Sequence, residues 1–118
     1  MINRGFKNYL VIYTKSEWDK RLDGLSKLNE YEEDNLEFIR YFMRGATELS
    51  LDAAGRVLLP KFLLEYAGIK ADVVLSCQLN KIEVWDAEAH KAAYANEPKN
   101  FSALAQRVMG NKTRRDDE

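Results

Sequence analysis

The chain has little of several residue types, and each scarcity excludes a class of protein. Its 118 residues include one cysteine, one histidine and two prolines. A lone cysteine, Cys77, forms no internal disulfide and has no metal-ligand spacing around it, so we expect a buried small side chain there. No apolar run approaches the roughly 20 residues that span a bilayer, and the N-terminus lacks the apolar segment of a signal peptide. These features predict a cytoplasmic protein with no metal, no cofactor and no membrane partner.

An excess of one charge is also lacking. The chain carries 18 basic and 19 acidic residues and a net charge of −1, which argues against a non-specific coat for nucleic acid. Any DNA binding must therefore be local. The single histidine, His90, shares an expected helix with Glu88 and has no nucleophile near it in sequence, and the glycines are dispersed rather than gathered in a phosphate-binding loop. We expect no enzyme and no small-molecule substrate.

The hydrophobic pattern predicts an α+β fold, in one domain or in two small repeats that share a core. Ser16 and Asp86 are expected to cap helices, Gly68 to end one, and Ser102 to cap the last. The expected elements are a strand at 9–13, helices from 16 and over about 32–43, strands at 46–51 and 56–59, a helix over 60–68, strands at 72–78 and 81–85, and helices over 87–96 and 102–110.

The segment 49–61 holds the most informative pattern. Asp52 and Arg56 flank Ala-Ala-Gly between two apolar stretches, and Gly55 can adopt a positive φ, so a tight reversal is expected. In such a turn the Asp52 carboxylate can accept nearby backbone N–H bonds or pair with the guanidinium, and so hold Arg56 at the tip. Arginine is the side chain best suited to phosphates and guanine edges. An isolated string of this kind is more often a turn with a solvated arginine, so the surrounding sequence has to decide.

Two further basic residues, Arg44 and Lys61, lie on either side of this turn, whereas the acidic residues of 30–37 lie some way off in sequence. A locally basic face on a neutral body is therefore expected. We take Arg56, Lys61 and Arg44 as the candidate DNA-binding residues, with Asp52 and Gly55 in support.

An internal repeat appears when Asn8–Tyr13 is aligned with Asn80–Trp85. Both segments combine an asparagine, alternating aliphatic residues and a closing aromatic residue, and in both a helix is expected to follow. The copies are offset by about 72 residues, so the first-repeat counterpart of Asp52 and Arg56 would fall roughly 20 residues before Met1.

The string LDAAGRVLLP, followed by AGI, VVLS and NKIEVWDAEAH, closely resembles the second repeat of MraZ, a family of bacterial transcriptional regulators in the SpoVT-AbrB superfamily. The N-terminal NYLVIYTKSEWDKRL resembles the end of the first repeat, and FSALAQRVMGN resembles a C-terminal helix of some members. The resemblance implies a swapped-hairpin, double-split β-barrel with flanking helices. Its expected divisions are 1–15 as a remnant of the first repeat, 16–45 as a helical linker, 46–90 as the second repeat, 91–110 as C-terminal helices and 111–118 as a disordered tail.

The resemblance also implies a function. In the family, two half-barrels complete one another, and subunits form a ring that reads repeated DNA boxes upstream of the division and cell-wall gene cluster. The implied partners are double-stranded DNA and further copies of the chain, at the nucleoid in the cytoplasm. Two alternatives stay open, an assembly module that has lost DNA binding with its first motif and an AbrB-like antitoxin. With only the last strand and helix of the first repeat expected, strand Tyr9–Tyr13 should lie on an exposed edge or pair with another subunit.

Overall fold

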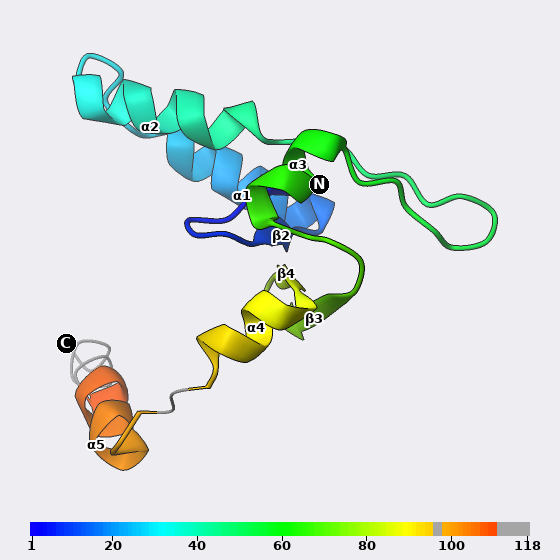
Figure 1. Cartoon of the computed structure of the whole chain (residues 1–118). Helices are drawn as coiled ribbons and strands as arrows, with labels where there is room; N and C mark the ends of the chain where they lie inside the picture. The colour runs from blue at the N-terminus through cyan, green and yellow to red at the C-terminus, as the bar shows by residue number, and fades with distance from the viewer. Residues whose placement is uncertain (96–97, 111–118) are drawn as a thin grey trace.

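A computed structural model describes residues 1–95 and 98–110, so the expected tail at 111–118 lies outside the described residues. The chain folds into helices and one antiparallel sheet, which confirms the α+β class (Figure 1). The elements are β1 (Ile2–Arg4), β2 (Leu10–Ile12), α1 (Lys15–Ser26), α2 (Glu33–Arg44), α3 (Lys61–Ala67), β3 (Val73–Cys77), β4 (Ile82–Asp86), α4 (Ala87–Ala93), α5 (Phe101–Ala105) and the π-helical turn η1 (Gln106–Gly110).

The four strands lie in the order β1-β2-β4-β3, so two hairpins meet through their second strands. We call this β2–β4 pairing the seam. Leu10 pairs with Val84, Val11 with Glu83 and Ile12 with Ile82. Because the sequence repeat equates β2 with β4, this register is symmetric about the Val11–Glu83 pair. The seam therefore joins two equivalent hairpins around an approximate two-fold axis.

The seam corrects the expectation that strand Tyr9–Tyr13 lies on an edge or pairs with another subunit. Its central part, β2, lies inside the sheet, with β1 on one side and β4 on the other. β2 is also the second strand of a complete hairpin, because the Gly5 N–H donates to the Tyr9 carbonyl oxygen and closes the turn between β1 and β2. At three residues, β1 is too short for alternation to reveal it in the sequence.

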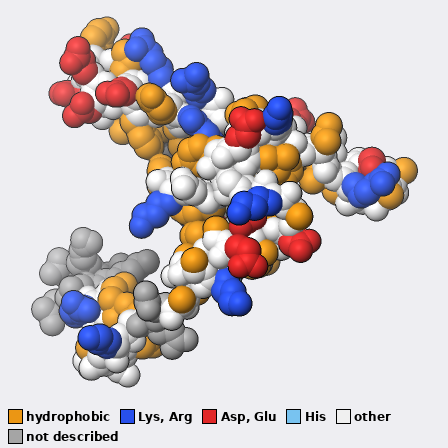
Figure 2. All heavy atoms as spheres, in the orientation of Figure 1, with side chains coloured by type: hydrophobic (Ala, Val, Ile, Leu, Met, Phe, Trp, Pro, Cys, Tyr) orange, Lys and Arg blue, Asp and Glu red, His pale blue; other side chains and the backbone are white. Residues whose placement is uncertain are grey.

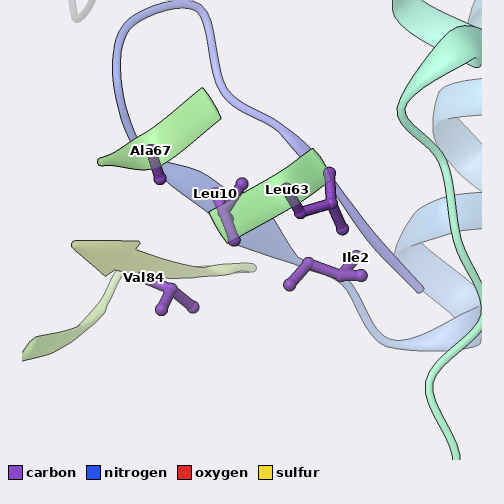
Figure 3. Close-up of a cluster of buried hydrophobic side chains, with 5 residues drawn as sticks. All are labelled: Ile2, Leu10, Leu63, Ala67 and Val84. Carbon is purple, nitrogen blue, oxygen red and sulfur yellow. The ribbon is translucent and has the colours of Figure 1, made fainter. Parts of the chain in front are cut away.

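One face of the sheet is covered by α3. The buried cluster there consists of Ile2, Leu10, Leu63, Ala67 and Val84 (Figure 3). As expected, α3 follows Pro60 directly and ends at Gly68, whose φ of 65° is left-handed. This short helix thus packs against β1 and β2 of one hairpin and against β4 of the other.

The opposite face is covered by α1 and α2. Trp18 of α1 is buried beside Tyr13, and its ring stacks on Phe42 of α2 with centroids 5.6 Å apart. The cap of α1 differs from expectation, since the Thr14 side chain, and not Ser16, accepts the Glu17 N–H. Asp86 caps α4 as expected, and both contacts fix the point where a strand passes into a helix.

The C-terminal part departs from the sequence prediction in two details. The expected helix over 87–96 is present as α4, which ends at Ala93. The last helix is capped by Asn100, whose side chain accepts the Ala103 N–H, and not by Ser102. Asparagine is a stronger cap than a serine already inside the first turn, so the helix begins earlier.

The expected strands at 46–51 and 56–59 do not form as strands. Thr47 makes one bridge to Ile2, and residues 48–59, which we call the arm, project away from the sheet between α2 and α3 (Figure 1). In the part of the chain that the structure describes, the backbone hydrogen bonds within the arm are confined to its tip. A strand needs a partner along its length. The sheet is open, so the structure shows no closed barrel.

The two outer strands differ in their cover. Ile2 in β1 and Leu75 in β3 occupy equivalent places, because they pair with the equivalent residues Ile12 and Val84. Ile2 is fully buried under α3, whereas Leu75 is 57% exposed. Cys77 on the same strand is also exposed, which corrects the expectation that it is buried. No described helix covers this side of β3 as α3 covers β1.

Candidate nucleic-acid interface

The tip of the arm is organised by one carboxylate. Oδ1 of Asp52 accepts the backbone N–H groups of Ala54 and Arg56 at 2.9 and 2.8 Å, and Oδ2 accepts Nε of Arg56 at 3.0 Å. The Asp52 N–H donates to the Arg56 carbonyl oxygen at 2.8 Å. The reversal expected from the sequence is therefore present, and both of the roles considered for Asp52 occur together.

Gly55 completes the turn because the chain reverses there with a φ of 79°, where residues with a Cβ are strained. The N–H of Arg56, followed by that of Ala54 and by the guanidinium, holds the pKa of Asp52 below its ordinary value. The carboxylate is ionised at neutral pH and pairs with the Arg56 guanidinium at the surface.

Arg56 is exposed at this tip, with 79% of its side chain accessible to solvent. Nε is occupied by Asp52, while the two terminal amino groups have no hydrogen-bond partner among the described residues. Those groups form one edge of the planar fork that binds phosphate oxygens or the edge of guanine. The arrangement can present a fixed pair of donors at a surface that stands clear of the body (Figure 2).

The other candidate cations lie at the base of the arm. Arg44 is the last residue of α2, and Lys61 is the first residue of α3, where its ammonium lies 4.0 Å from the Glu65 carboxylate. Arg56 is at the tip of the arm, where the turn with Asp52 closes. Arg44 and Lys61 therefore flank the base of the arm and do not form a single cluster with Arg56, and Glu48 adds a negative charge at that base.

The arm also carries apolar side chains along its length. These residues were expected to form half-buried strands. Leu49 and Leu59, nearest the body, pack against the core cluster under α3. Further out, Leu51 is 73% exposed and Leu58 is 90% exposed. The alternation of Leu49 and Leu51 with polar residues predicted that these side chains prefer burial. It did not predict which surface would bury them.

His90, the one candidate for proton transfer, is packed in an aromatic group. Its ring lies 4.6 Å from that of Tyr94 and 5.8 Å, edge-on, from that of Trp85, and Trp85 stacks on Tyr9 at 4.8 Å. Trp85 also donates its indole N–H to Glu83. Packing accounts for these contacts.

None of the helices in residues 1–95 and 98–110 combines the length and the apolar character needed to cross a membrane. Within the same residues, no three side chains of the metal-binding types come together.

Comparison with known proteins gives the family. The family model described as "MraZ protein, putative antitoxin-like" matches residues 42–112, which include the arm and everything from α3 to η1. A protein named transcriptional regulator MraZ from Flavobacterium psychrophilum is 39% identical over 106 residues, which cover 90% of this chain and 68% of the relative. Proteins of the same name from Christiangramia forsetii and Cytophaga hutchinsonii are 36% and 31% identical, over 90% and 92% of this chain and 68% and 72% of theirs. The chain belongs to the MraZ family.

Proposed function

We propose that this chain is a sequence-specific DNA-binding transcriptional regulator and that Arg56 makes its main contact with DNA. The observation that carries the proposal is the geometry at the tip of the arm, where Asp52 fixes an exposed arginine through its backbone and through Nε. The relatives that this chain matches over 90% of its length are named transcriptional regulators. A fixed arginine fork on a projecting turn suits the major groove.

Lys61 and Arg44 supply phosphate contacts from the base of the arm. Both are exposed, and neither has a short ion pair with a carboxylate among the described residues. Phosphate contacts set position and affinity, whereas base contacts set sequence preference. A chain with a net charge of −1 makes few such contacts, so strong binding requires several copies on one DNA.

Those copies assemble through the arm and the open sheet. Leu51 and Leu58 are apolar and exposed, and no described residue pairs with the sides of the arm as a neighbouring strand would. A second copy that pairs with the arm buries these side chains and closes the sheet into the swapped-hairpin barrel of the superfamily. In this assembly, 1–15 belongs to a first repeat, 16–45 is a helical linker, 46–90 is the second repeat and 91–110 forms C-terminal helices.

The DNA target is a set of repeated boxes upstream of the division and cell-wall gene cluster, bound by a ring of subunits at the nucleoid. Family membership supports this target, and the projecting arms provide the means. A ring would present one Arg56 per subunit, so the spacing of the arms would match repeated boxes rather than a single site.

The test is a fluorescence-anisotropy titration of the full chain with a labelled duplex that carries these boxes and with a scrambled duplex. We expect tighter binding to the boxes, and Arg56→Ala should lose about 1–3 kcal/mol per engaged arm. Arg40→Ala, an exposed arginine in the middle of α2, is the matched control and should bind as the wild type. Equal binding of Arg56→Ala would remove Arg56 from the site. If the wild type binds neither duplex, an assembly module without DNA binding is the correct function.

A further inference from the structure

A cavity of about 280 Å³ lies between the β1–β2 turn, α2 and α3, on a different part of the molecule from the tip of the arm. Three separate segments of the chain form its walls, so it exists only in the folded chain. Its lining residues are Arg4, Gly5, Phe6, Phe38, Tyr41, Phe42 and Tyr66.

The walls of the cavity are aromatic and are held in place by specific contacts. The ring of Phe6 stacks on that of Phe38 with centroids 6.4 Å apart, although Phe6 is 74% exposed. The Tyr66 hydroxyl donates to the Gly5 carbonyl oxygen at 2.7 Å and ties α3 to the turn. Phe38 in turn contacts Phe42, with centroids 5.9 Å apart. An open aromatic surface of this kind offers stacking to a flat ligand without rearrangement.

The cavity also contains a charge. The guanidinium of Arg4 lies 5.4 Å from the ring centroid of Tyr66 and 5.8 Å from that of Tyr41, and one of its amino groups donates to the Tyr41 carbonyl oxygen. No carboxylate of the described residues forms an ion pair with it. A guanidinium has five N–H donors, so this side chain retains donors that a ligand can use.

The position of Arg4 is fixed from the other side by the backbone. A Cβ added at Gly45 would lie 2.6 Å from Nε of Arg4, so the absence of a side chain there lets the end of α2 approach this close. Asn3 adds a hydrogen bond from Nδ2 to the Phe42 carbonyl oxygen at 2.8 Å. The side chain of Arg4, at the end of β1, is thus held against the end of α2 by contacts within the chain.

We propose that this cavity binds a small planar aromatic carboxylate. The ring of the ligand packs against the stacked pair of Phe6 and Phe38, and its carboxylate accepts hydrogen bonds from Arg4. A volume of about 280 Å³ suits a compound with a single ring or with two fused rings. A single cation favours one carboxylate over a nucleotide with several phosphate charges.

The test is a calorimetric titration of the full chain, without DNA, with 2-naphthoate and in parallel with the neutral 2-naphthalenemethanol. We expect saturable binding of one naphthoate per chain and about tenfold weaker binding of the alcohol, since only the carboxylate pairs with Arg4. Phe6→Ala should weaken the naphthoate by about tenfold, because it removes one wall.

Leu79→Ala is the matched control. Leu79 is fully exposed in the β3–β4 turn, which corresponds to the β1–β2 turn in the other hairpin, and it does not line this cavity. This variant should bind naphthoate as the wild type does. Absence of saturable binding, equal binding of the alcohol, or an unchanged affinity in Phe6→Ala overturns the proposal. Arg4→Lys, which keeps the charge and loses the planar fork, should bind more weakly than the wild type in a chain whose circular dichroism is unchanged.

Discussion

The carboxylate of Asp52 holds Arg56 at two points, through the backbone N–H at 2.8 Å and through Nε at 3.0 Å. One group therefore fixes both the position of the residue and the direction of its side chain. A side chain that is already ordered loses less conformational entropy on binding. In the proposed DNA complex, Asp52 is a positioning residue and Arg56 is the contact.

Asp52→Asn separates these two effects. The amide oxygen can still accept the N–H groups of Ala54 and Arg56, so the turn should persist, while the ion pair with the guanidinium is lost. We expect a stability within about 0.5 kcal/mol of the wild type, because the site is exposed, and DNA binding weaker than wild type but stronger than that of Arg56→Ala. Thermal unfolding and anisotropy measure the two quantities. Tighter binding at low salt would instead place the carboxylate against the phosphates.

Acid should destabilise the chain through Asp86. The N–H of Lys70 and then that of Ala89 hold the pKa of Asp86 below its ordinary value in the folded chain. Its contribution to stability is therefore complete above the unfolded value of about 3.9 and is lost as the pH falls through the lower folded value. We expect the Tm to fall as the pH is lowered below about 4.

Asp86→Asn should reduce this acid sensitivity, because asparagine still caps a helix but does not titrate. Asp23→Asn, at an exposed carboxylate paired with Lys27, serves as the control and should follow the wild type. The comparison is the change in Tm between pH 7 and pH 3. The account fails if Asp86→Asn loses as much Tm as the wild type over that interval.

Ile2 and Leu75 offer a direct measure of what α3 contributes. They are equivalent about the seam, but only Ile2 is buried. Ile2→Ala should destabilise the chain by about 2–4 kcal/mol, and Leu75→Ala by less than about 0.5 kcal/mol. Urea denaturation at low protein concentration, where copies of the chain are apart, gives both values. Equal losses would mean that β3 is covered in solution.

Self-association should depend on the exposed leucines of the arm. The double variant Leu51→Ser and Leu58→Ser removes apolar surface that the described residues leave exposed. We expect light scattering to give a larger mass than a monomer for the wild type and a shift toward the monomer for this variant. Leu79→Ser, at a still more exposed leucine in a turn, should leave the mass unchanged. A wild type that is monomeric at all concentrations would contradict the proposed assembly.

Local signals in the sequence predicted several local features of the structure, although the caps expected at Ser16 and Ser102 were wrong. Gly68 marked the end of α3, Asp86 the start of α4, and Asp52 with Gly55 the turn at the tip of the arm. Each of these depends on residues within a few positions of one another, where side-chain chemistry decides the backbone conformation. The candidate arginine at the tip was found in this way.

Features that depend on distant partners were not predictable. The arm has the alternation of a strand, yet alternation reports which side chains prefer burial and not whether a neighbouring strand is present. Cys77 was expected to be buried for the same reason, and it is exposed because no described element covers that side of β3. The three residues of β1 are too few to show an alternating pattern in the sequence. The position of β1 in the sheet follows from the turn that leads into β2.

The symmetry of the seam has a consequence for the origin of the fold. Leu10 contacts Val84 and Ile12 contacts Ile82 in the same way that two identical chains meet across a two-fold axis. A protein with one such hairpin and one arm would make this contact between two molecules, at a strength set by their concentration. Joining both hairpins in one polypeptide makes the encounter intramolecular and independent of dilution. The two hairpins then need not be identical, and at the centre of the seam a valine faces a glutamate.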